Sequence, residues 1–553
     1  MIEKFFDIGI ETVKFVHWLR PVFMTSAAAP SRVLPAKKGT RPAPDRFRFD
    51  RRASGLLMHP TSLPGPHGSG DVGPAAHAFI DFLAQARQRW WQMLPVGPPG
   101  PPPGNGPYGS TSAFAGSVWL ISPELLHEDG LLDRSDLTRA PRASEHVVNY
   151  PAIYRHRGKL LRRAFARFES DLARHDALHA FREREKSWLD DFALFSALRD
   201  HHGGRPWLQW PRDVKLRHPD ALARARAALI SEIRFHEFCQ LAFDQQWSRL
   251  RSHAHAKNVG LIGDIPIFVA LDSCDVWAHT PLFMLDRSGR PKYVSGAPPD
   301  DFCPDGQLWG HPQYQWDVHR GTSFAWWVAR FASMMRRFDG VRIDHFLGFL
   351  RAWAVPAGAK TARRGTWLPG PGGAVFDAVR KELGDVAIIA EDLGVLTPQA
   401  AALRDKMRFP GMRVMQFGFG RGGEYHLPHR YPRRAVAYTG THDNNTTAGW
   451  FADLVQRNGH VGSALSAERD KALEYLEANT ASRVPWQMIR AAMASVADTV
   501  IFPVQDLLAL GQEARMNVPG IAAGQWQWRL PAGKLTSALA SRLRRMTELY
   551  ERT

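Results

Sequence analysis

Charged side chains sit in short apolar runs of this 553-residue sequence, where a buried strand would normally carry none. The run FDGVRIDHF carries Arg342 and Asp344, and the later run VAIIAEDLG carries Glu391. Burying such groups costs free energy unless they are paired and hydrogen-bonded, so their presence in a strand indicates a paired or functional role. Two carboxyl groups across one bond, one ionised and one protonated, suit glycoside chemistry, and they lie about 5–5.5 Å apart when configuration is retained. Asp344 and Glu391 therefore predict such a pair.

Arg342 is placed to hold one of these carboxyl groups as an anion. Residues i and i+2 of a strand point to the same side, so the guanidinium of Arg342 is expected beside Asp344. Charge and hydrogen bonding would then keep Asp344 ionised. A plain buried ion pair, without catalytic meaning, is the alternative interpretation of these two residues.

The apolar runs recur along the chain with helical segments, such as FDAVRKEL and PQAAALRDKM, between them. The runs cover residues 55–60, 90–97, 259–270, 338–346, 386–394, 412–420, 435–445 and 499–508. Near-continuous hydrophobicity is typical of parallel strands that are buried on both faces. Eight such alternations of strand and helix predict an α/β fold, a (β/α)8 TIM barrel.

In a parallel barrel, the side chains at the carboxyl ends of the strands converge on the active-site mouth. Six of the eight runs end on polar residues, which are His59, Asp264, Arg342, Asp344, His345, Glu391, Asp392, His442, Asp443, Asn444, Gln505 and Asp506. A single strand-end aspartate more often caps a helix or pairs with a neighbour. Because six strands share this feature, we expect several of these residues to form a site.

Uneven gaps between the runs predict insertions and a separate N-terminal segment. Residues 122–256 have a helical pattern too long for one crossover, and residues 271–325 form a second, loop-like insertion rich in Pro, Gly and Trp. Loops this long in a barrel are usually functional. We assign residues 1–52 to a poorly ordered extension and residues 53–553 to the catalytic barrel. A cleaved leader or a mis-assigned start would also explain the extension.

The net charge of +17 is a reason to consider nucleic acid as a partner, because lysine and arginine bind phosphate groups. The arginines, however, are scattered through helical stretches with acids interleaved, as in KLLRRAFARFESDLARHDALHAFREREKSW, so a solvated surface is the simpler interpretation. Three cysteines are too few for a disulfide framework and have no zinc-binding spacing. A reducing, cytoplasmic location and the absence of a membrane span are expected.

Aromatic residues support a sugar substrate. At the predicted mouth, aromatic rings can contact the apolar faces of sugars, and the loops there contain Tyr108, Trp309, Tyr314 and Trp316. Trp316 is better explained as pinning its loop.

A metal-dependent barrel hydrolase is a rival class of enzyme, and it would use His59, His345 and His442 as ligands. The one HxH pair, His253 and His255, precedes a strand rather than ending one, which weakens the metal hypothesis.

From about residue 54 to 531 the chain resembles the amylomaltases, the bacterial disproportionating 4-alpha-glucanotransferases of the alpha-amylase superfamily. The motifs that carry the resemblance are LLMHPTSLPGPHGSGDVG, YGSTSAFAG, GDIPIFVALDSCDVW, GAPPDDFCPDGQLWG, FDGVRIDHFLGF, IIAEDLGVLTP, YTGTHDNNT and QDLLALGQEARMNVPG. The resemblance implies a barrel without the C-terminal β-domain of alpha-amylases, and no metal or organic cofactor. It also implies malto-oligosaccharides and starch- or glycogen-derived alpha-1,4-glucans as substrates.

The resemblance assigns roles to residues. Asp344 would be the nucleophile, Glu391 the general acid and base, and Asp443 a third carboxylate that grips sugar hydroxyls. Substrate-binding residues would be Tyr108, Asp264, Trp309, Arg342, His345, His442 and Asn517.

The chain departs from the family pattern at Asn445, His311 and Leu347, where an acid, an asparagine and an arginine are common. These departures concern acceptor preference and chain length rather than the reaction type. A retaining alpha-glucan hydrolase and a non-catalytic glucan-binding protein remain the alternatives to a transferase.

Overall fold

The computed structural model describes residues 47–100, 105–138, 144–299, 303–394, 397–456, 464–521 and 523–553. Every element described below belongs to the compact unit Thr40–Thr553. Most of the predicted extension, residues 1–46, lies outside the described residues. Within the described part, no helix combines the length and the apolar character that crossing a membrane requires.

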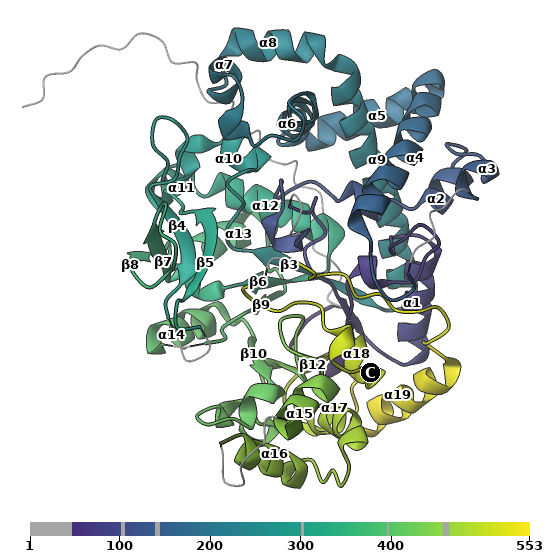
Figure 1. Cartoon of the computed structure of the whole chain (residues 1–553), viewed down its shortest axis with the longest axis vertical. Coiled ribbons are helices and arrows are strands. Elements are labelled where there is room, and N and C mark those ends of the chain that lie inside the picture. The colour runs from purple at the N-terminus through teal and green to yellow at the C-terminus, as the bar shows by residue number, and fades with distance from the viewer. Residues whose placement is uncertain are drawn as a thin grey trace, which may run out of the picture. The chain divides into compact units, whose positions relative to one another are not determined.

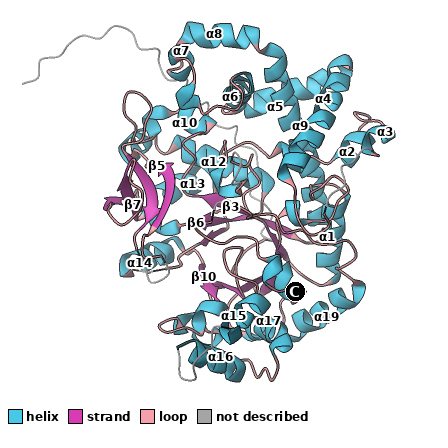
Figure 2. Cartoon of the chain, viewed as in Figure 1, coloured by secondary structure: helices cyan, strands magenta, loops and turns pink. Residues whose placement is uncertain are grey.

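Eight parallel strands close into a barrel in the order β1, β2, β3, β6, β9, β10, β11, β12 and back to β1. Figure 2 draws the strands in magenta and the helices in cyan. Their bounds are β1 Ala53–Leu57, β2 Trp90–Gln92, β3 Gly260–Pro266, β6 Gly340–Asp344, β9 Ile388–Ala390, β10 Gly411–Val414, β11 Ala435–Tyr438 and β12 Thr499–Pro503. Each predicted apolar run supplies one of these strands, and nearly every strand residue is buried. The prediction of a (β/α)8 barrel is therefore confirmed.

Helices surround this barrel (Figure 1). Those that follow or precede barrel strands are α1 Pro74–Gln85, α12 Ala325–Arg337, α13 Ala374–Leu383, α14 Pro398–Met407, α15 Thr447–Gln456, α16 Ala464–Tyr475, α17 Val484–Ala494, α18 Val504–Leu507 and α19 Ser537–Leu549. After β12 the described residues form these last two helices and no strand.

The long segment between β2 and β3 is helical, as its sequence pattern indicates. Its helices are α2 Pro123–Glu128, α3 Arg134–Leu137, α4 Tyr150–Ser170, α5 His175–Glu185, α6 Leu189–His201, α7 Arg212–Lys215, α8 Pro219–Ala228 and α9 Ile230–Ala256. In Figure 1, most of these helices gather at the upper right, and α9 contacts α4, α5 and α6 there as well as α1 of the barrel. The helix α9 thus ties the insertion to the barrel.

The second insertion contains more regular structure than the predicted loop. It holds α10 Cys274–Ala278, β4 Tyr293–Ala297, β5 Gln307–Pro312 and α11 Trp316–Gly321. Strands β4 and β5 join β7 Arg351–Pro356 and β8 Thr366–Pro369 in an antiparallel sheet of order β5, β4, β7, β8. The strand β5 escapes a pattern search because its six residues include Gly310, at φ +80°, and the register shifts between β4 and β5.

Two phenylalanines close the amino end of the barrel. Phe47 and Phe49 are buried, and their rings lie 5.7 and 4.8 Å from that of Trp90. Glycines at the starts of β3 and β6 make room for them, because a Cβ at Gly260 would lie 2.7 Å from Phe47 and one at Gly340 would lie 2.6 Å from Phe49. The last residues of the predicted extension therefore pack into the core.

Replacement Phe49→Ala should leave a cavity at this end of the barrel and destabilise the fold by about 3–5 kcal/mol. A lower melting temperature in thermal unfolding would report the loss. Leu172→Ala is the matched control, because its side chain is 76% exposed and its loss should change stability by less than about 0.5 kcal/mol. Equal melting temperatures for the two variants would contradict the packing role of Phe49.

Candidate active site

Asp344 and Glu391 lie side by side at the carboxyl ends of β6 and β9. The two strands pair with Ile343 opposite Ala390, so the next residue of each strand reaches the same level. The amide of Glu391 donates to Ile343 O at 3.0 Å, and the amide of His345 donates to Glu391 Oε2 at 2.7 Å. The two carboxyl groups that the sequence predicts as a pair therefore lie in one site.

Arg342 joins two carboxylates in the barrel. Its Nη2 lies 3.0 Å from Asp344 Oδ1, the predicted contact, and its Nη1 donates to both oxygens of Asp264 at 3.0 and 2.9 Å. Asp264 stands directly opposite Arg342 in the register of β3 and β6. Burial lowers the pKa of Arg342, but the two carboxylates outweigh burial and raise that pKa well above its usual value. The guanidinium is thus a fixed positive charge.

The environments of the two paired carboxyl groups differ. The side chain of Asp344 is 31% exposed and ion-paired, whereas Glu391 is buried. Burial raises the pKa of Glu391 to about 7, although Arg342 opposes this shift, and the negative charge of Asp344 adds to it. Backbone amides of His345 and Leu393 hold its two oxygens at 2.7 and 2.8 Å. Glu391 can therefore hold or release a proton near neutral pH.

Asp443 follows β11 and is held by the segment that comes after β12. Asn517 Nδ2 donates to Asp443 Oδ1 at 2.6 Å, and Arg515 Nη2 donates to its main-chain oxygen at 2.9 Å. Arg515 also donates to Asn517 O at 2.8 Å, so it fixes both residues. Sequence reasoning missed Arg515, although it stands two residues before Asn517 in the motif RMNVPG.

Tyr108 connects Asp264 to the β11 side of the mouth. Its hydroxyl lies 2.7 Å from Asp264 Oδ2 and 2.7 Å from His442 Nε2, and Nε2 lies 3.3 Å from Asp443 Oδ2. A phenol has one proton to donate. When Tyr108 donates to Asp264, His442 Nε2 must carry hydrogen and donate to the Tyr108 oxygen. Side chains from β3, β6, β11 and the loop at Tyr108 thus form one polar network.

Trp309 of β5 lies against His345, which follows the nucleophile candidate Asp344. The two rings meet edge to face, with centroids 4.8 Å apart. His345 has a left-handed backbone, φ +52°, which is uncommon for a residue other than glycine and typical of constrained sites. His311, one of the departures from the family pattern, has its pKa lowered to about 4 by burial, against the opposing charge of Asp344. The small antiparallel sheet therefore contributes to the mouth.

Two hollows lie at the barrel mouth. One is lined by His59, His442, Asn444, Gln505 and Arg515, among others, and the second by Tyr108, Asp264 and Phe268 among others. Burial, with a smaller contribution from His442, lowers the pKa of His59 to about 3, so this imidazole is neutral.

Several other strand-end polar residues stabilise the fold instead. Asp392 accepts from Met412 N at 2.8 Å and pairs with Arg404, while Asp506 accepts from Thr447 N at 2.7 Å. Asn444 Oδ1 accepts from the amide of Thr441 at 2.9 Å. Tyr314, which we expected at the mouth, is buried and donates to Ile267 O at 2.8 Å. Trp316 packs on Trp327 and Phe349, as its loop-pinning interpretation predicts.

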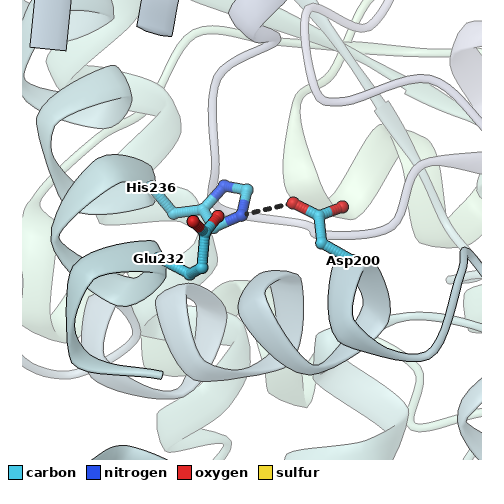
Figure 3. A group of neighbouring side chains, drawn as sticks. All are labelled: Asp200, Glu232 and His236. Atoms are coloured by element: carbon cyan, nitrogen blue, oxygen red, sulfur yellow. Dashed lines mark hydrogen bonds and ion pairs between the residues drawn. The ribbon is translucent and has the colours of Figure 1, made fainter. Parts of the chain in front are cut away.

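The two histidines of the HxH pair contact carboxylates of Asp81 and Asp339. Of the HxH pair, His253 lies 3.1 Å from Asp81, and His255 lies 2.9 Å from Asp339. In the described part of the chain, only Asp200, Glu232 and His236 gather closely enough to hold a cation, on α6 and α9 (Figure 3). Glu232 is already paired with Arg162, and His236 Nε2 lies 3.0 Å from Asp200.

Comparison with known proteins supports the same chemistry. A family model described as 4-alpha-glucanotransferase matches residues 58–536. The chain is 45% identical over 506 residues to the 4-alpha-glucanotransferase of Thermus thermophilus, an alignment that covers 91% of this chain and 99% of that protein. It is 44% identical over 511 residues to the Synechocystis 4-alpha-glucanotransferase, with coverage of 91% and 99%.

A solved structure agrees with this result. The amylomaltase from Streptococcus agalactiae in complex with acarbose superimposes with a TM-score of 0.86 at 38% identity, covering 91% of this chain and all of that one. The resemblance to amylomaltases that the motifs indicate is confirmed. The chain belongs to the 4-alpha-glucanotransferase family, the amylomaltases, and is a transferase that acts on alpha-1,4-glucans.

Proposed function

We propose that Asp344 is the nucleophile and Glu391 the general acid and base of this transferase. The difference between their environments supports the assignment. Asp344 reaches the open mouth and is paired with the fixed charge of Arg342. Glu391 is buried beside it, with a pKa of about 7 that lets it both give and take a proton at neutral pH.

The reaction is then a double displacement that retains configuration. An Asp344 oxygen attacks the anomeric carbon of an alpha-1,4-glucan, the bond to the departing glycosidic oxygen breaks, and Glu391 gives that oxygen its proton. Glu391, now ionised, next takes the proton of an acceptor's 4-hydroxyl. The acceptor oxygen attacks the same carbon from the opposite side, releases Asp344 and restores the alpha linkage.

The remaining residues of the polar network bind the sugar at the cleavage position. Asp443 offers carboxylate oxygens that can accept from sugar hydroxyls, and Asn517 and His442 orient it. Tyr108 and Asp264 continue the same wall, and Asp264 also anchors Arg342. Trp309 and His345 supply a partly apolar surface for a neighbouring sugar ring.

A transferase must let a sugar outcompete water for the covalent intermediate. Binding sites for the acceptor raise its effective concentration, and a covered mouth excludes solvent. We assign this cover to the segment 271–325, whose strand β5 brings Trp309 to His345. Retaining hydrolysis by the same carboxylates is the alternative outcome, and a non-catalytic glucan-binding protein is disfavoured by the complete set of three carboxylates.

Other properties follow as proposals. We place the enzyme in the cytoplasm, with three free cysteines, and without nucleic acid as a partner, since many arginines pair with acids, as Arg249 does with Asp129 and Arg234 with Glu169. No cofactor enters the proposed mechanism. We assign residues 1–52 to an extension, whose Phe47 and Phe49 pack into the barrel, and residues 53–553 to the catalytic domain, with insertions at about 122–256 and 271–325.

Maltotriose as the only substrate should yield glucose together with a ladder of longer malto-oligosaccharides. Asp344→Asn should lower this rate by on the order of 10³-fold or more, because the attacking carboxylate is lost. Asp385→Asn is the matched control, because this side chain is 91% exposed, and its rate should equal that of the wild type. Chromatography of the digests measures both. Wild-type transfer by Asp344→Asn would overturn the nucleophile assignment, and shortening without a ladder would indicate a hydrolase.

The rate should also depend on the ionisation of Glu391. Since burial raises the pKa of Glu391 to about 7, it is protonated below pH 7 and loses its proton above. Attack on the donor needs the protonated form, so kcat/KM for the donor should fall about tenfold per pH unit above pH 7. A pH profile of initial rates measures this limb. A kcat/KM that stays constant to pH 9 would exclude Glu391 as the acid with this pKa.

A further inference from the structure

A groove lies apart from the polar network, between the start of α17, the first three turns of α19 and the residues that end α18. We call it the α17/α19 groove, and its volume is about 710 Å³. Its lining residues are Ser482, Arg483, Trp486, Gln487, Leu507, Leu508, Ala509, Lys534, Thr536, Leu539, Arg542 and Met546. The volume is within the range of roughly 300–1,000 Å³ that is typical of small-molecule sites.

The charge of the α17/α19 groove is positive and uncompensated. Arg483, Lys534 and Arg542 line it, together with no aspartate or glutamate. Among the described residues, none of these three cations has an acidic partner within ion-pairing distance, whereas arginines such as Arg162 and Arg249 do. Three cations that share one concave surface attract an anion, because a groove concentrates their field.

The groove also has the surfaces that a sugar needs. The guanidinium carbon of Arg542 lies 3.6 Å from the ring centre of Trp486, a cation–π contact that holds the two side chains together. Burial and the nearby Arg545 lower the pKa of Arg542, as expected for a cation without an acidic neighbour. Apolar side chains such as Leu539 line part of the groove, and hydroxyl and amide groups offer hydrogen bonds.

We propose that the α17/α19 groove binds a phosphate monoester carried on a sugar. A phosphate monoester bears about −1.5 to −2 charges at pH 7 and accepts several charge-assisted hydrogen bonds, which matches the unpaired cations. The volume of about 710 Å³ is that of a small-molecule site, so the groove has room for a sugar as well as a phosphate. A neutral glucan alone would leave the cations without partners.

The groove is distinct from the catalytic mouth but shares a wall with it. Gln505, at the start of α18, lines the mouth hollow with His442 and Arg515, while Leu508 and Ala509, just after the same helix, line the groove. A bound sugar phosphate would therefore leave the three carboxylates free, and removing the groove cations should leave transfer from maltotriose unchanged.

Isothermal titration with glucose 6-phosphate tests the proposal on the full-length protein. The variant is Arg483→Gln/Lys534→Gln, which keeps the Arg542–Trp486 stack, and the matched control is Arg212→Gln/Arg224→Gln, which removes two cations of α7 and α8. The groove variant should bind at least about tenfold more weakly, a loss of about 1.4 kcal/mol, while the control binds as the wild type does. Transfer from maltotriose at the wild-type rate shows that both variants are folded.

Inorganic phosphate and maltotriose serve as comparison ligands. Glucose 6-phosphate should bind more tightly than inorganic phosphate, and the groove variant should bind maltotriose as the wild type does. Equal affinity of the groove variant and the wild type for glucose 6-phosphate would overturn the site. If the wild type binds inorganic phosphate as tightly as glucose 6-phosphate, the proposal that the groove recognises a sugar is overturned. If the groove variant binds maltotriose more weakly than the wild type does, the groove is a neutral glucan site, which contradicts the proposal. If the double variant fails to fold, Lys534→Gln, at an exposed loop position, gives the same comparison.

Discussion

One buried guanidinium organises the carboxylates of this transferase. Arg342 contacts Asp344 with one amino group and both oxygens of Asp264 with the other, from the centre of the barrel mouth. A buried charge is tolerated only when its partners are held in place. Removing one partner leaves the other charges buried and unpaired, which lowers the stability of the fold by about 3–5 kcal/mol. The same contacts orient the carboxylate of Asp344 and connect it, through Asp264 and Tyr108, to the β11 side of the mouth.

The barrel register produces the asymmetry on which acid and base chemistry depends. Parallel pairing puts Asp344 and Glu391 at the same height on neighbouring strands, so Glu391 lies close enough to feel the charge of Asp344. Arg342 pairs with Asp344, while Glu391 is buried and feels the negative charge of its neighbour. Two neighbouring carboxyl groups thereby differ, because Asp344 is ion-paired and partly exposed, whereas burial raises the pKa of Glu391 to about 7.

The sequence predicted well what depends on local periodicity. Eight apolar runs became eight barrel strands, and the i, i+2 rule anticipated the contact of Arg342 with Asp344. It did not reveal contacts that depend on register between strands, such as Asp264 with Arg342, and it did not show that Asp392, next to Glu391, binds Met412 N instead of serving the site. The small sheet and the burial of Tyr314 were also missed, because short strands interrupted by glycine and proline have no clear period.

The charge coupling between Asp344 and Glu391 is the central claim, and the most direct measurement is an NMR titration of the side-chain carboxyl carbon of Glu391. In the wild-type protein this carbon should titrate near pH 7. In Asp344→Asn the pKa should fall, because the neighbouring negative charge is gone while Arg342 remains. A wild-type pKa near 4.5, or a pKa that does not change in the variant, would contradict the account.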